Sequence, residues 1–566
     1  MEKKKIDRDF IKKILPIIVL LFCEYFFFRN ILTTDLLFGD DGDGKLCTLI
    51  TEHWYQVLKG QKSFDTLGIF YPLQGTIAYS DMMLGYAPVY CILRALHFNM
   101  FFSYKWTLII YHVFGALTMY GMLHRGLKVR REWAVIGTIS FSISSGYAMM
   151  LLHTQLVIIS LVPLMLWFVI GFIDALYKGN RLRKNICALA AVFMMGVLMY
   201  TGWYVAFFAI LFTLFFVICY CVVSLCGKKG VFINQVKDFF YKIGWDILLY
   251  IVFALLIIVP FLMLYIPVLN LNGGRVYEGI TCFIPQFVDL INVTPYNLCM
   301  GWIFNALHLG DRSLTSEVWQ GYSLITWLLF LVLSICGLQK LQKKSEVRIL
   351  SFSVLLAVLF SIIFTVQIGE EGFSLWYWIY KLIPGATSIR AVGRYLFFLL
   401  VPVSILIAVF GSRCSDAWMA KMTEKYRDHK VVIAGYGIAV LVLFTLVFTG
   451  SIMQDGVMAR WSEADELQVL SEVPPPPSDC ESFFVMDNGQ AEYSRSYYNL
   501  QAMAIAAKYS LGTLNGYTGV FPDGSDGLVN IFADDYLGNV SRWIRKMEIK
   551  NVYAYNLTTR VWTKVY

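Results

Sequence analysis

The sequence predicts an all-α polytopic membrane protein of about eleven transmembrane helices, followed by a small extracytoplasmic α/β domain. Of its 566 residues, 58% are hydrophobic and only 15% are charged, whereas a soluble domain carries about 25% charged residues. Apolar stretches long enough to span a bilayer recur as far as residue 453. The basic residues gather in short segments between these stretches, as orientation signals do. The net charge of +8 therefore does not indicate nucleic-acid binding.

The predicted spans are 14–32, 104–123, 133–150, 156–177, 186–201, 204–226, 246–269, 318–337, 349–366, 396–412 and 431–453. Segments 125–131, 178–184, 228–242, 340–348 and 413–430 each hold four or five bases and are assigned to the cytoplasm, with the N-terminal tail 1–13. No small-residue cleavage site follows the first apolar stretch, which predicts a retained helix. An odd number of spans places the C-terminus outside.

Three long outside loops follow from this scheme, at 33–103, 271–316 and 367–395, within a transmembrane domain of 14–453. The apolar stretch from Met82 to Leu96 is short and contains Pro88 and Arg94. We interpret it as a helix lying at the membrane interface rather than as a span.

The tail has a different composition. Residues 454–478 are predicted to be a linker that includes the stiff run Pro474–Pro477. Residues 479–566 combine expected strands at 482–486 and 551–555 with a helix at 498–509. This mixture predicts a small α/β domain.

The first outside loop carries the densest polar cluster, Gly39-Asp40-Asp41-Gly42-Asp43-Gly44. Crowding three carboxylates at the mouth of an apolar bundle is costly unless a metal ion, a hydroxyl or a cation offsets their charge. The Asp-x-Asp spacing of Asp41 and Asp43 brings two carboxylates within reach of one hard cation such as Mg²⁺ or Mn²⁺. A solvated turn is the alternative interpretation.

Other outside segments supply further candidates. Asp81 is either a helix cap or a second acidic wall of the same site. His153 and Gln155 occupy a short turn between spans, where a structural role is the alternative. Arg390 and Arg394 are four residues apart, which predicts one helical face offering guanidinium groups to phosphate. Snorkelling at the interface is the alternative for these arginines.

Several features favour structural interpretations. Glu24, Arg29 and Asp174 lie near predicted span ends, which favours interfacial anchoring. The 12 cysteines mostly lie in apolar stretches, although Cys282 and Cys299 share an outside loop and are able to pair there. The sequence has no phosphate-binding glycine loop, zinc motif or serine-nucleophile elbow, which argues against ATP-driven transport.

In the order of these features the chain resembles bacterial polytopic membrane proteins of the GT-C glycosyltransferase superfamily, in particular the YfhO-like proteins. The stretches that carry the resemblance are Gly39–Lys45, Phe70-Tyr71-Pro72, Tyr79-Ser80-Asp81, Leu84-Gly85, His153-Thr154-Gln155 with Pro163, Pro384-Gly385 through Arg394, and Asn515–Gly519. They are short motifs spread over most of the chain.

The resemblance implies a bacterial plasma-membrane enzyme that takes a sugar from a polyprenyl-phosphate donor on the extracytoplasmic face. The acceptor would be a cell-envelope polymer or glycolipid, and the anomeric centre would invert. It implies Asp41 or Asp43 as catalytic base, with Asp40 behind them, or a divalent metal there. Asp81, His153 and Gln155 would support the site, and Arg390 and Arg394 would bind the donor phosphate. A flippase for lipid-linked sugars and a non-catalytic envelope-assembly protein remain the alternatives.

Overall fold

A computed structural model describes residues 2–308, 317, 319, 322–341, 346–369, 373–425, 429–487 and 494–566. Several predicted features therefore fall partly outside the described residues. These are the loops 271–316 and 367–395, the start of the span 318–337, the basic segments 340–348 and 413–430, and the C-terminal domain 479–566.

Within the described residues, nine helices are long and apolar enough to cross a membrane. The helices of the bundle are α1 (Glu2–Thr33), α4 (Met100–Gly121), α5 (Arg131–Ser142), α7 (Val162–Tyr177), α8 (Arg181–Met199), α9 (Trp203–Ile243), α10 (Asp246–Asn272), α13 (Leu324–Lys340), α14 (Glu346–Thr365), α16 (Arg394–Phe398), α17 (Leu400–Lys425) and α18 (His429–Thr449). The shorter helix α13 is also apolar. The chain is a multi-pass membrane protein.

The predicted span 133–150 is broken into two helices, α5 and α6 (Ser145–Met150). Ile143 leaves the helical conformation, and the Ser144 hydroxyl accepts a hydrogen bond from the Tyr147 N–H at 3.0 Å, which starts a new helix. Helix α5 nevertheless packs deep in the bundle, because a β-carbon at Gly411 of α17 would meet the Trp133 ring at 2.1 Å.

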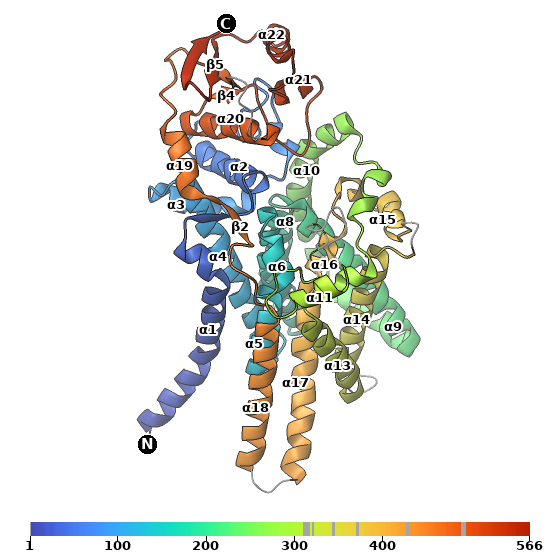
Figure 1. Ribbon diagram of the computed structural model, residues 1–566. Helices are drawn as coiled ribbons and strands as arrows, with labels where there is room; N and C mark the ends of the chain where they lie inside the picture. The colour runs from blue at the N-terminus through green and yellow to red at the C-terminus, as the bar shows by residue number, and fades with distance from the viewer. Residues whose placement is uncertain are drawn as a thin grey trace.

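The bundle has two distinct ends (Figure 1). The N-terminus lies at the foot, whereas the long loops and the C-terminal domain lie together at the head, which we call the loop end. Helices α2 (Asp43–Leu58) and α3 (Ala87–Ala95) of the first long loop belong to this end. Helix α3 lies within the apolar stretch expected at the interface, and its nine residues are too few to span a bilayer.

The segment predicted as a linker is built into the first loop. Strand β2 (Ala459–Ser462) pairs antiparallel with β1 (Leu36–Phe38), and the Trp461 indole N–H donates to the Phe38 carbonyl at 2.9 Å. Helix α19 (Glu463–Ser471) follows. Beyond it, the Trp562 indole N–H donates to the Pro474 carbonyl, so the polyproline run is held against the C-terminal sheet.

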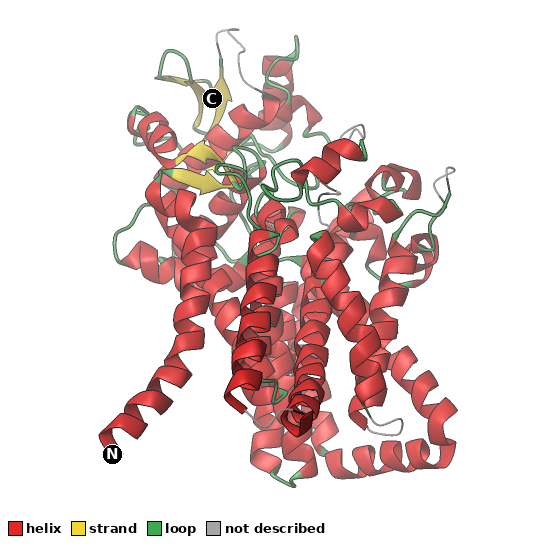
Figure 2. Ribbon diagram, turned by 60° about the horizontal axis from the view of Figure 1, so that its bottom comes forward, coloured by secondary structure: helices red, strands yellow, loops and turns green. Residues whose placement is uncertain are grey.

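The C-terminal domain is a four-stranded sheet in the order β4-β3-β5-β6, at the same end of the molecule as the β1–β2 pair (Figure 2). Its elements are β3 (Ser482–Met486), α20 (Arg495–Tyr509), β4 (Gly512–Thr513), α21 (Asp526–Val529), α22 (Tyr536–Lys546), β5 (Val552–Asn556) and β6 (Val561–Lys564). Strands β3, β4 and β5 are parallel, and helices make the crossovers that parallel pairing requires. The sheet docks on the first loop, since Tyr71 and Gly68 exchange backbone hydrogen bonds with Thr513.

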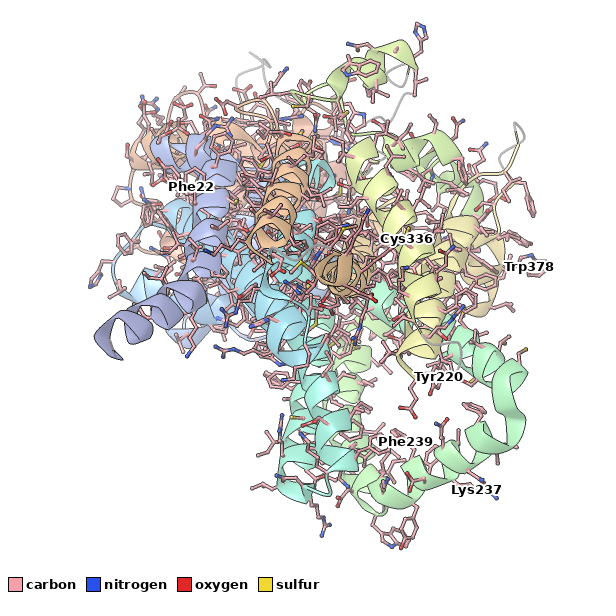
Figure 3. The ribbon with its side chains drawn as sticks, turned by 90° about the horizontal axis from the view of Figure 1, so that it is seen from below. Phe22, Tyr220, Lys237, Phe239, Cys336 and Trp378 are labelled. Atoms are coloured by element: carbon pink, nitrogen blue, oxygen red, sulfur yellow. The ribbon has the colours of Figure 1, made fainter. Side chains whose placement is uncertain are left out.

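Seen from the foot, helix α9 bends away from the bundle, and its residues Tyr220, Lys237 and Phe239 lie along an arc that returns toward it (Figure 3). Its end contacts α7, because Phe239 lies 6.4 Å from Phe172 between ring centroids and Lys242 lies over the Tyr177 ring. Phe22 of α1 is exposed on the outside of the protein, as expected for an apolar side chain on a membrane-spanning helix, and Trp378 of the predicted loop 367–395 is exposed as well.

The interpretation of Glu24 as an interfacial anchor is wrong. Its side chain is buried inside the bundle, where an Oε2 atom lies 2.9 Å from the His112 Nε2 atom of α4. The rings of Phe27, Phe28 and Tyr147 surround the imidazole. Burial with a polar partner removes the charge of Glu24 from lipid, which sequence position alone does not reveal.

The other predicted anchors lie at helix ends. Arg29 pairs with Asp455 at 2.5 Å, and Asp174 pairs with Lys178 at 2.8 Å. Cys282 and Cys299 are exposed free thiols and do not pair in the structure.

Candidate functional site

The acidic turn is shaped by its own first carboxylate. The Asp40 Oδ1 atom accepts hydrogen bonds from the N–H groups of Gly42 and Asp43, at 3.1 and 2.8 Å. Gly44 has to be glycine, since a β-carbon there would lie 2.5 Å from the Phe38 carbonyl oxygen. Asp40 is thus occupied in folding the turn, and Asp43 begins helix α2.

His153 links two carboxylates from distant parts of the chain. Its Nδ1 atom lies 3.2 Å from Asp43 Oδ2, and its Nε2 atom lies 3.7 Å from Glu317 Oε1. The Asp43 side chain keeps 39% of its surface exposed, whereas Glu317 keeps 8%. A substrate can therefore reach the carboxylate of Asp43, whereas the protein covers the carboxylate of Glu317.

Glu317 is absent from the sequence predictions. It lies at the boundary between a predicted loop that ends at 316 and a predicted span that begins at 318, and so was assigned to neither. An acidic residue beside the start of a span is itself a signal, because a charge there needs a partner.

Both predicted arginines converge on Glu317. Arg394 is buried and forms a forked pair with the carboxylate, Nε to Oε2 at 3.0 Å and Nη2 to Oε1 at 2.9 Å. Arg390 is 44% exposed and its Nη2 atom lies 3.9 Å from Glu317 Oε1. The guanidinium of Arg394 is committed to Glu317, whereas Arg390 has donors left for a ligand.

The predicted helical face for the two arginines is wrong. Helix α16 begins at Arg394, and Arg390 precedes it in an irregular segment. The Tyr204 hydroxyl accepts the N–H groups of Arg390 and Ala391 at 2.9 and 3.2 Å, so the backbone bonds to α9 instead of forming a helical turn.

The pKa values of the carboxylates in this region shift in opposite directions. Burial alone would raise the pKa of Asp43, but the hydrogen bond and charge of His153, with the fields of Arg394 and Arg390, hold it below its ordinary value. The pKa of Glu317 is likewise lowered: burial opposes the shift, and Arg394 and His153 outweigh it. Burial raises the pKa of Asp81 to about 6, and the nearby charge of Asp43 adds to the effect.

Asp81 is held at the start of another helix. Its Oδ1 atom accepts the N–H of Trp203, the first residue of α9, at 2.9 Å. Asp81 therefore caps α9, and the charges of Arg394 and Asp43 act on its pKa. The cap predicted from the sequence was for the interfacial helix that follows Asp81, whereas α3 has Tyr86 at its N-cap and Asp81 bonds to α9 instead. The acidic-wall interpretation stays a prediction.

Gln155 anchors the turn that contains His153 to helix α2. Its Oε1 atom accepts from the Cys47 thiol at 3.6 Å, one turn of α2 beyond Asp43. The neighbouring Thr154 accepts from the hydroxyls of Tyr86 and Tyr104. These bonds fix the turn that presents His153 to Asp43.

The C-terminal domain contributes Tyr517 to the same region. Burial raises the pKa of Tyr517, and the charges of Asp43 and Asp40 raise it further. The sequence contains the short motif Asn515–Gly519 but gives no indication that it reaches the first loop. The close packing of Gly516 on Phe70, where a β-carbon would lie 2.5 Å from the ring, explains the approach.

The described residues contain no group of three ligands close enough to hold a metal ion. Asp43 is engaged by His153, while the charge of Asp41 acts on Lys45. The two carboxylates with Asp-x-Asp spacing thus have different neighbours. The arrangement does not fit a metal at Asp41 and Asp43.

A separate cleft of about 410 Å³ lies at the far end of α2, lined in part by Glu52, Tyr55, Arg94 and Lys508. Arg94 is already paired with Glu52 at 2.8 Å, and Lys508 donates to the Leu470 carbonyl. Its main charged groups are therefore satisfied within the protein, which favours the Asp43 cluster as the site.

No known family model matches the chain, and no curated protein matches its sequence. The chain is similar to crystal structures of an Archaeoglobus fulgidus oligosaccharyltransferase. In the structure tethered to an acceptor peptide with the NVT sequon, the match has a TM-score of 0.47 and 11% identity over 96% of this chain and 69% of that chain. In the complex with Zn and sulfate, the values are 0.42 and 10%, over 95% and 67%. Both TM-scores are below 0.5, so the fold described above rests on the contacts of this chain alone.

Proposed function

We propose that this protein is a glycosyltransferase that moves a sugar from a polyprenyl-phosphate donor to an acceptor hydroxyl at the loop end of the bundle. The observation that carries the proposal is the convergence of Asp43, His153, Glu317 and the two arginines, drawn from four separate segments. Such a cluster offers a carboxylate to a hydroxyl and a guanidinium to a phosphate, which are the two needs of this reaction.

In the proposed reaction the acceptor hydroxyl attacks the anomeric carbon of the donor sugar. A new carbon–oxygen bond forms while the bond from that carbon to the phosphate oxygen breaks, and its electron pair stays on the phosphate. Asp43 takes the hydroxyl proton, and His153 holds the carboxylate in place. Arg390 offsets the charge that develops on the leaving phosphate. One displacement inverts the anomeric centre.

The partly exposed position of Asp43 between the bundle and the C-terminal domain suits an acceptor that arrives from water while the donor chain stays in lipid. We propose that this end faces the extracytoplasmic side of a bacterial plasma membrane. Helix α4 starts at this end, where Asn99 bonds to Glu463, and α7 follows the His153 turn, so the predicted basic segments 125–131 and 178–184 come after spans that lead away from it. The acceptor is then a cell-envelope polymer or glycolipid.

The test compares two carboxylates of one turn. Asp43→Asn and Asp41→Asn remove the same charge, but only Asp43 contacts His153. With purified protein in nanodiscs, labelled polyprenyl-phosphate hexose and an envelope glycolipid extract, Asp43→Asn should lower transfer about 10²-fold or more. Asp41→Asn should stay within about threefold of the wild type. Equal activity of Asp43→Asn and wild type, or no donor cleavage by the wild type, would contradict the proposal.

A flippase for lipid-linked sugars is the second candidate, and the buried Glu24–His112 pair favours it. Ionisable residues inside a bundle commonly mark transport pathways. The two candidates predict different results, because a flippase leaves the sugar–phosphate bond intact and moves the donor between leaflets. Quenching of a fluorescent donor analogue in proteoliposomes, with Glu24→Gln as the variant, would distinguish them.

A further inference from the structure

A third arginine lies beside the two that the sequence singles out. Arg275 follows the turn Gly273-Gly274 at the end of α10, and its N–H donates to the Thr387 carbonyl at 3.0 Å. The Tyr380 hydroxyl donates to the Arg275 carbonyl at 2.7 Å. These bonds fix the backbone of Arg275 against the segment that leads to Arg390.

Tyr204 is the common neighbour of the three arginines. Its oxygen accepts the backbone N–H of Arg390, its ring lies 5.0 Å below the Arg394 guanidinium, and it is near enough to Arg275 to influence the pKa of that guanidinium. Within the described part of the chain, the Tyr204 hydroxyl has no acceptor for its own proton. That proton is therefore free to be donated to a ligand.

The charges at this place are not balanced by the protein. Arg394 is paired with Glu317, and Arg390 approaches the same carboxylate at 3.9 Å. Arg275 is exposed and forms no ion pair with any described residue, while the like charge of Arg390 acts on it. Partial burial, followed by this repulsion, lowers the pKa of Arg275. The Arg275–Thr387 hydrogen bond joins the segments that carry Arg275 and Arg390, and Glu317, already paired with Arg394, is the carboxylate that approaches them. The excess of positive charge favours an anion here.

We propose that Arg275, Arg390 and the Tyr204 hydroxyl bind a second phosphate, so that the carrier lipid is a polyprenyl diphosphate. The inference rests on the proposed function, in which Arg390 holds the phosphate next to the sugar. On such a donor, the anion adjacent to this phosphate is another phosphate. Arginine suits it because a planar fork of donors can bridge two neighbouring phosphate oxygens.

The experiment measures binding, so it does not require turnover. Purified full-length protein in nanodiscs is titrated with polyprenyl monophosphate, polyprenyl diphosphate and inorganic diphosphate. The wild type should bind the diphosphate lipid about tenfold more tightly than the monophosphate lipid, a difference of about 1.4 kcal/mol. Inorganic diphosphate should compete only at a concentration about 100-fold higher, because it lacks the lipid.

Arg275→Gln should bring the diphosphate lipid to the affinity of the monophosphate lipid and change the latter less than twofold. Lys381→Gln removes a positive charge from the neighbouring helix α15 (Trp376–Leu382) and should change neither affinity. Tyr204→Phe should reduce the preference for diphosphate, and an unchanged elution profile shows that each variant is folded.

Equal affinities for the two lipids in the wild type would overturn the inference, as would an equal loss for both lipids in Arg275→Gln. Tight binding of inorganic diphosphate would assign the site to a free anion instead. Failure of the proposed function gives a different result, because Asp43→Asn would then retain full transfer whatever the phosphate preference.

Discussion

Asp43 and Lys45 lie two residues apart on the first turn of α2, yet their charges are satisfied in opposite ways. Lys45 is fully buried, and its ammonium lies 2.6 Å from Glu466 of α19 in a closed pair. Asp43 is partly exposed and shares His153 with Glu317. A closed pair leaves no capacity for a ligand, whereas the open cluster keeps an accessible carboxylate and an arginine with unused donors.

The comparison teaches how one turn can serve both folding and chemistry. Burial lowers the pKa of Lys45 and Glu466 opposes that shift, so this pair depends on staying together. It joins α2 of the first loop to α19, about 420 residues later in the chain. Because this pair fixes the start of α2, the Asp43 cluster beside it stays in position without a fully buried ion pair at Asp43.

Breaking the closed pair should have the largest effect. Glu466→Gln leaves the Lys45 ammonium buried without its counter-ion, and we expect a loss of about 3–5 kcal/mol in stability. The double variant Lys45→Met with Glu466→Leu should recover most of this loss, because two apolar side chains need no counter-charge. Thermal unfolding in detergent, followed by intrinsic fluorescence, measures both.

Transfer activity per folded molecule should change little in that double variant. If Glu466→Gln and the double variant were equally unstable, the pair would not be a coupled contact. If the double variant folds well but loses most of its transfer activity, Lys45 takes part in the reaction.

The open cluster should respond differently at its two arginines. Arg390→Gln removes donors that face outward, so the KM for the donor should rise about tenfold while the KM for the acceptor stays constant. Arg394→Gln leaves buried Glu317 without its forked partner and should lower stability and kcat together. Steady-state kinetics with each substrate varied in turn separates the two effects.

The reverse pattern, with Arg394 acting mainly on donor KM and Arg390 on stability, would contradict the assignment of Arg394 as a positioning residue. Equal effects on donor and acceptor KM for Arg390→Gln would indicate a general distortion of the loop end.

Much of the fold could be predicted from the sequence because span length, hydropathy and loop charge are local properties. The acidic turn, His153 and both arginines stand out in the sequence because each motif is short and contiguous, and the structure brings them together. The broken span at Ile143 was missed because apolar composition does not reveal a serine cap within it.

The missing parts of the site depend on contacts between distant segments. Glu317, Tyr204 and Arg275 lie in or beside apolar stretches, and each is an ordinary residue until Arg390 and Arg394 approach it. The pairing of β1 with β2 and the approach of Tyr517 likewise join segments more than 400 residues apart. Such pairings leave no periodic pattern in the sequence.

The smallest expected effect is at Asp81, which shares features with both the closed Lys45–Glu466 pair and the open Asp43 cluster. It is partly buried like a structural group, yet the charges of Asp43 and Arg394 act on it. Its pKa is raised to about 6 in the folded protein from an ordinary value of 3.8. Between these values the folded state binds more protons than the unfolded state, so this group makes the protein less stable as pH rises through that window.

Asparagine at position 81 can still accept the Trp203 N–H but does not titrate. We therefore expect Asp81→Asn to raise the melting temperature by about 2 °C at pH 8 and to leave it unchanged near pH 4. Melting curves of both proteins from pH 4 to pH 8 measure the difference. An offset that stays constant across this range would show that Asp81 is not protonated in the folded protein near pH 5, and that it belongs with the ionised carboxylates Asp43 and Glu317.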